Sequence, residues 1–136
     1  MKKLATLLLS ALAVLIICSS FTPKDHNKAK GIEPVYLFGF SFSFADSTIY
    51  FTDIQLIDSA QTGSHGMLMK RPVFSEQMRS HLMQQGVAAP TCAIFYFSSV
   101  EKADKQMTKI MKQYEKKSLY WKIVSKEEFS FINILD

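Results

Sequence analysis

The chain has 136 residues, of which 48% are hydrophobic, with two cysteines and a formal net charge of +4. This length allows one domain with a modest core, and so few cysteines exclude a disulfide-rich scaffold. The excess charge lies near the N-terminus, because from residue 35 onward 11 basic residues stand against 10 acidic ones. The part expected to fold is nearly neutral, which argues against a nucleic-acid binder.

The first twenty residues predict a signal for export. Lys2 and Lys3 precede an apolar run that ends at Ile17, and small residues follow it. This order is typical of a secretory signal peptide, and the run is shorter than the roughly 20 apolar residues of a membrane span. We therefore expect residues 1–20 to be a signal peptide. The protein should act outside the cytoplasm, in the periplasm, at the cell envelope or secreted.

The end of this signal leaves two alternatives. Cleavage after Ser20 fits the rule that small residues precede the cut. Cys18 resembles the lipidated cysteine of a lipoprotein, although Ile17 stands where that signal has a small residue. Cleavage after Ser20 is the favoured prediction, and a lipid anchor at Cys18 is the alternative contact with a membrane. Residues 21–34 are polar with two prolines, which predicts a linker, so residues 35–136 are expected to form a single domain.

Strict alternation predicts the first strand over residues 35–44. Its aromatic side chains share one face, which we expect to be buried: Tyr36, Phe38, Phe40, Phe42 and Phe44. β-branched and aromatic residues predict a second strand over residues 48–57, and the short turn between the two indicates a hairpin. Residues 58–72 contain two glycines and are expected to form a long loop.

Two helices are predicted farther along the chain. Ser75 is expected to cap the first helix, from Glu76 to about Gln85, and Gly86 to end it. Ser99 is expected to cap the second, over residues 100–117. The second helix has an apolar stripe at helical spacing: Val100, Ala103, Met107, Ile110, Met111 and Tyr114. Residues 91–98 predict a central strand, in which Cys92 is expected to be a buried, unreactive thiol. Residues 119–125 and 129–135 predict the last two strands.

The predicted order is therefore β-β-α-β-α-β-β. Two helices with apolar stripes need a sheet to cover. The expected fold is an α+β two-layer sandwich. It has a four- to five-stranded, mixed and mostly antiparallel sheet with both helices on one face.

The second helix also carries a stripe of lysines opposite its apolar stripe. Steps of three and four residues place them on one side: Lys102, Lys105, Lys109, Lys112 and Lys116. Such a surface can contact phosphates, carboxylates or acidic headgroups, and a solvated helix face that aids solubility is the alternative. Arg71 and Arg79 are further candidates, because arginine binds carboxylates and phosphates bidentately. A surface ion pair is the alternative for each.

The predicted loop contains the candidate metal ligands. His65, Met67 and Met69 alternate there, and imidazole and thioether groups are ligands that Cu(I) prefers. Methionine also fills gaps in cores, and we expect neither a metal nor a cofactor. The sequence has no Ser/His/Asp set, no CxxC and no glycine-rich phosphate-binding loop, so no catalytic residue is assigned.

Two resemblances add to these predictions. Residues 35–135 resemble short exported bacterial proteins without an assigned activity, in the hairpin FADSTIYFTDIQ and in the segment FSEQMRSHL. This resemblance implies a single exported domain. The order of elements is also similar to that of the GIY-YIG nuclease fold, with Tyr36, Tyr50 and Arg79 in comparable places. The strand signatures and the metal-binding glutamate of that family are absent here.

The sequence therefore predicts an exported, non-enzymatic binding module at the cell envelope. Its partner would be a protein or an anionic ligand, and its contact surfaces the lysine helix and residues 58–72. Two alternatives stay open. One is a degenerate metal-dependent nuclease or hydrolase that uses Tyr50, Arg79 and His81. The other is a structural or assembly protein that self-associates through a sheet edge at its last strand.

Overall fold

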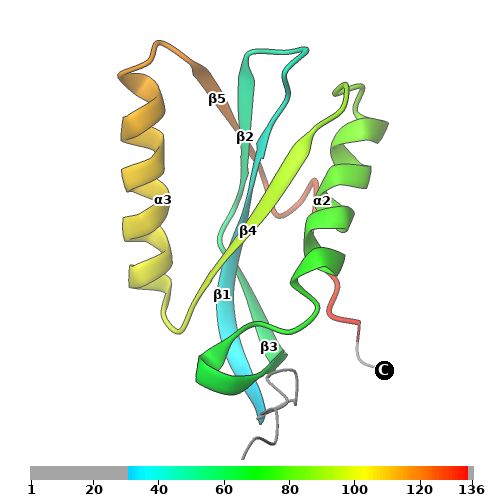
Figure 1. The fold of residues 1–136 in the computed structure, drawn as a ribbon, viewed down its shortest axis with the longest axis vertical. Coiled ribbons are helices and arrows are strands. Elements are labelled where there is room, and N and C mark those ends of the chain that lie inside the picture. The colour runs from blue at the N-terminus through cyan, green and yellow to red at the C-terminus, as the bar shows by residue number, and fades with distance from the viewer. Residues whose placement is uncertain (1–30, 135–136) are drawn as a thin grey trace, which may run out of the picture.

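The computed structural model describes residues 31–134 (Figure 1). The predicted signal peptide with Cys18, and residues 21–30 of the predicted linker, lie outside the described residues. The elements are β1 (Gly31–Phe42), β2 (Thr48–Thr52), β3 (Gln55–Thr62), η1 (Ser64–Gly66), α2 (Arg71–Gln84), β4 (Thr91–Phe97), α3 (Val100–Glu115) and β5 (Tyr120–Val124). The α+β class, the mixed sheet of five strands and the order in which helices alternate with the later strands are confirmed.

Strand β1 is the centre of the sheet. It pairs antiparallel with β2, β3 and β4, while β5 pairs parallel with β2. Phe40 faces Phe51 of β2 on one side and Ala93 of β4 on the other. Leu37 likewise has partners in both β3 and β4. Strand β4 therefore occupies one side of β1, and β2 and β3 share the other side.

The predicted second strand is in fact two strands. β2 ends at Thr52 and β3 begins at Gln55, and β2 and β3 pair with opposite ends of β1. Residues 58–62 are therefore strand where we expected a loop, and residues 31–34 belong to β1 where we expected a linker. The register shifts between Glu33 and Val35. A shift of this kind accommodates Pro34, which has no N–H for the ladder.

The two helices cover opposite faces of the sheet (Figure 1). Leu37 belongs to the cluster that contains Met78 of α2, and Phe38 belongs to the cluster that contains Met107 of α3. The expectation of both helices on one face is wrong, because β1 has buried apolar side chains on both of its faces. Val35 and Leu37 need a cover as much as the aromatic residues opposite them do. The molecule therefore has three layers, helix on sheet on helix.

The helix ends were predicted with mixed success. Ser99 caps α3 as expected, since its side chain accepts a hydrogen bond from the Lys102 N–H. Gly86 follows α2 with φ +88°, a conformation that glycine adopts readily. However, α2 begins at Arg71, with Pro72 in its first turn, and Ser75 lies inside the helix. Proline suits the first turn because the N–H it lacks would have no partner there.

The last predicted strand is not a strand. Residues 126–128 form a turn after β5, and residues 129–134 join no ladder. They run beside α2, and we call them the C-terminal strap. Burial alternates along the strap, since Phe131 is buried while Ser130 and Ile132 are exposed. Alternation of this kind predicts a strand, but the N–H groups of Phe131 and Ile132 donate to glutamine side chains and not to another strand.

Candidate functional site

The lysine stripe lies on the solvent side of α3. All of its members are exposed: Lys102, Lys105, Lys109, Lys112 and Lys116. Ala103, Met107 and Ile110 of the same helix are buried against the sheet and fix its orientation. Lys102 Nζ lies 3.4 Å from Ser98 Oγ, and within residues 31–134 no ion pair involves these lysines. The predicted placement of the five lysines on one exposed side of the helix is therefore confirmed. The stripe forms a cationic surface on a helix whose opposite side is buried against the sheet.

The two arginines do not extend this surface. The Arg71 Nε–H donates a 2.9 Å hydrogen bond to the carbonyl of Ile94, and its guanidinium lies 5.5 Å from the centroid of the Tyr96 ring. Arg79 pairs with Glu76 at 3.1 Å on the exposed side of α2. Both arginines belong to α2, and so they lie across the sheet from the lysines. Arg79 therefore forms the surface ion pair that was the alternative to a role in ligand binding.

The candidate metal ligands lie in the turn between β3 and α2. His65 has φ 61° inside η1, and both His65 and Met67 are exposed, whereas Met69 is half-buried. The Met69 N–H donates to the carbonyl of Gln61, which ties this turn to β3. Among the residues that the structure describes, no group of three His, Cys, Asp or Glu side chains is placed to hold a metal ion.

The residues that the nuclease resemblance places together are divided between the two faces of the sheet. Tyr36 packs with the α3 cluster and Tyr50 with the α2 cluster. The Tyr50 hydroxyl donates to Asp46 Oδ2 at 3.2 Å, and burial, followed by the Asp46 carboxylate, raises the pKa of Tyr50. His81 shares a cavity of about 260 Å³ with Tyr50, but Arg79 does not line it. Tyr50, Arg79 and His81 therefore do not line one cavity together.

Cys92 is half-buried beside Ser41. Its thiol donates to Ser41 Oγ at 3.3 Å, and burial raises the pKa of Cys92 above its ordinary value of 9.0. A raised pKa lowers the fraction of thiolate, which is the reactive form. The expectation of an unreactive thiol therefore agrees with its surroundings, although the side chain is less buried than expected.

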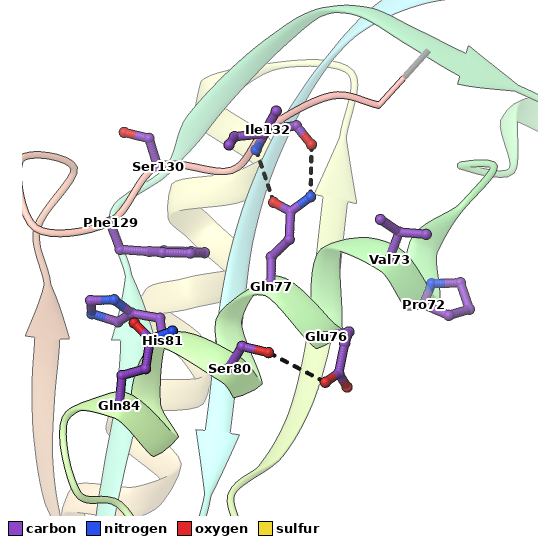
Figure 2. Close-up of a pocket in the computed structure, with 10 residues that line it drawn as sticks. All are labelled: Pro72, Val73, Glu76, Gln77, Ser80, His81, Gln84, Phe129, Ser130 and Ile132. Atoms are coloured by element: carbon purple, nitrogen blue, oxygen red, sulfur yellow. Dashed lines mark hydrogen bonds between the residues drawn. The ribbon is translucent and has the colours of Figure 1, made fainter. Parts of the chain in front are cut away.

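A groove between α2 and the C-terminal strap is the feature that the sequence did not indicate (Figure 2). It has a volume of about 660 Å³, and its lining is mostly apolar. At one end the Phe129 ring packs on His81, with centroids 5.0 Å apart. In the middle the Gln77 amide reaches across to Ile132 (Figure 2). No local sequence signal could have found this groove, because α2 and the strap are about fifty residues apart.

The comparisons with known proteins leave the geometry as the basis for function. No family model, no curated protein and no solved structure matches the chain. Of the helices formed by residues 31–134, none is long and apolar enough to cross a membrane.

Proposed function

We propose that this protein is an exported, non-enzymatic module that docks on an anionic partner at the cell envelope. The observation that carries the proposal is the lysine face of α3, which is exposed along the helix and backed by a buried apolar stripe. The residue pattern at the N-terminus supports export.

The chemistry of the lysine face favours a partner with several negative charges. A row of ammonium groups on one helix attracts carboxylates or phosphates that are spaced along a surface. Lysine presents a mobile point charge, whereas arginine fixes a bidentate geometry. Because residues 35–136 are nearly neutral as a whole, the attraction is concentrated on this face. Binding should therefore depend strongly on salt, since ions screen exposed charges.

Charge reversal on α3 tests the proposal. The double variant Lys105→Glu/Lys109→Glu should bind poly-glutamate at least about tenfold more weakly than the natural protein at low salt, by removal of favourable Coulomb energy. Fluorescence anisotropy of a labelled poly-glutamate measures this loss. Both lysines are exposed, so circular dichroism and the melting temperature should show that the fold is retained.

A second double variant controls for net charge. Lys122→Glu/Lys126→Glu makes the same change in total charge at exposed positions of β5 and of the turn that follows it. It should keep most of the affinity for poly-glutamate. Equal losses in the two variants would show that only the net charge matters, and the lysine face would then have no specific role.

A further inference from the structure

The C-terminal strap is held the way a binding groove holds a separate peptide. The Gln55 side chain of β3 donates through Nε2 to the carbonyl of Phe129 at 2.9 Å. Its Oε1 accepts the N–H of Phe131 at 2.8 Å. Gln55 is buried, so this pair of bonds lies inside the molecule.

A second glutamine grips the other edge of the strap. Gln77 of α2 donates to the carbonyl of Ile132 at 2.8 Å and accepts the Ile132 N–H at 2.9 Å (Figure 2). These are the two bonds that a residue exchanges with its partner in an antiparallel ladder. Two side-chain amides thus replace the neighbouring strands that an extended segment would have in a sheet.

Aromatic side chains at alternate positions anchor the strap between these amides. Phe131 is only 7% exposed and meets Phe74 edge-on, with ring centroids 6.0 Å apart. It also meets Phe129 edge-on at 4.8 Å, and Phe129 in turn packs on His81. The sheet leaves room for the Phe131 ring because Gly39 has no side chain. A Cβ on Gly39 would lie 3.3 Å from Phe131 Cζ.

We infer that the groove that holds the strap, which is formed by Gln55, Gln77 and Phe74 and is distinct from the open groove beside the strap, is a binding site for an extended peptide with phenylalanine at two alternate positions, and that a second copy of the chain supplies that peptide. Backbone hydrogen bonds with pockets for alternate side chains are the usual means of recognising extended peptides. The strap of a second copy offers the same carbonyls, N–H groups and rings as the strap seated here. Exchange of identical elements between copies is a low-cost route to a dimer.

The position of the strap allows the exchange. It follows the last strand of the sheet, so its departure leaves every ladder intact. The turn before it is closed by two backbone hydrogen bonds to the Ser125 carbonyl, from the N–H groups of Glu128 and Phe129. Opening that turn would let the strap reach another molecule. This inference concerns a different surface from the lysine face and does not depend on the proposed function.

Two complementary variants test the exchange. Gln77→Ala removes the side chain that holds Ile132, and Ile132→Pro removes the N–H that Gln77 accepts. Ile132 is 68% exposed, so its side chain contributes little to the core. In a mixture, the natural strap of the Gln77→Ala chain can enter the natural groove of the Ile132→Pro chain and restore both bonds.

We expect the mixture to form a heterodimer up to about tenfold more readily than either variant forms a homodimer. The complete pair of hydrogen bonds at Ile132 forms only when a natural strap enters a natural groove, which gives a net gain of one hydrogen bond between unlike chains. Native mass spectrometry of chains with different isotope labels counts each species. Ile134→Pro is the matched control, since the structure shows no hydrogen bond from the Ile134 N–H within the described residues. Replacing Ile132→Pro by Ile134→Pro in the mixture should abolish the gain.

A labelled peptide with the sequence of residues 127–134 gives an independent readout. It should bind the Ile132→Pro chain about tenfold more tightly than the natural chain, whose groove is already filled. A peptide with Phe131→Ala should not bind. A mixture no richer in dimers than its components, or a peptide that binds the two chains equally, would overturn the inference. If either variant unfolds, the natural chain decides: it must bind the natural peptide at high concentration in preference to the Phe131→Ala peptide.

Discussion

At the scale of single residues, Gly39 is a position where the sheet and α2 approach closely. A Cβ built there would lie 2.3 Å from the sulfur of Met78, which is fully buried. The Gly39 N–H donates a hydrogen bond to Thr52 Oγ1 at 2.8 Å. The close packing at Gly39 therefore depends on the absence of a side chain, and no turn or positive φ is involved.

Gly39→Ala should destabilise the fold by about 1–3 kcal/mol, because the added methyl group overfills a packed core. Urea unfolding followed by circular dichroism measures the free energy of unfolding. Gly31→Ala is the matched control in the same strand, since nothing lies within 4 Å of the Cβ it would add. The packing account fails if the two substitutions have equal effects.

Asp46 gives a second residue-scale prediction, on pH. Hydrogen bonds from Thr48, assisted by Tyr50, hold the pKa of the Asp46 carboxyl below its ordinary value of 3.8. Because the folded-state pKa is the lower one, the stability that this carboxylate contributes is present above pH 3.8. It is lost as the pH falls through the folded-state pKa. NMR titration should give a midpoint below 3.8 for Asp46.

The same titration tests the cause of the shift. Thr48→Ala should return the Asp46 midpoint toward 3.8, since the side-chain hydrogen bond from Thr48 is the largest lowering influence. Tyr50→Phe should return it by less. An unchanged midpoint in Thr48→Ala would mean that another group sets the pKa of Asp46.

At the scale of elements, the sequence predicts the helices and strands whose residue patterns are local, such as a cap or an apolar stripe. Ser99 and the apolar stripe of α3 define that helix locally, and the lysine face follows from the same spacing. The break between β2 and β3 has no comparable signal, because it depends on which half of β1 each strand joins. The prediction of both helices on one face is wrong because Val35 and Leu37, on the face of β1 opposite Phe38, also need an apolar cover.

The strap shows why the groove could not be predicted. Phe129 and Phe131 alternate as in a strand, but an extended segment becomes a strand only if another backbone pairs with it. Here the partner is Gln55, whose bonds to the strap span 74 and 76 residues of sequence. The available hint was Gln55 among the apolar residues of the predicted strand 48–57. An amide that becomes buried there needs a partner, but the sequence does not say where that partner lies.

The outer strands β4 and β5 also differ in protection. Arg71 covers part of the free edge of β4 through its bond to the Ile94 carbonyl. Strand β5 has exposed side chains, with Tyr120 80% and Ile123 44% exposed. Such an edge is a place where sheets associate. Because the strap leaves the sheet directly after β5, an exchange of straps would bring two copies together near this edge.

At the scale of the whole molecule, the layers predict a gradient of stability. Strand β1 pairs with three strands and is covered by a helix on each face. The amides of residues 36–40 should therefore exchange with solvent only through global unfolding. The strap is outside the sheet and is held by two side-chain amides, so the N–H groups of Phe131 and Ile132 should exchange through a smaller, local opening.

Native-state hydrogen exchange by NMR can separate these two openings. The opening free energy of the Phe131 amide should be lower than that of β1 and insensitive to low concentrations of urea, because local opening exposes little surface. Gln77→Ala should reduce protection in the strap further and leave the difference between β1 and β4 unchanged. If Phe131 instead exchanges as slowly as Gly39, the strap opens only when the whole domain unfolds. A strap of that kind could not leave its groove under native conditions. Two copies could then swap their straps only during folding.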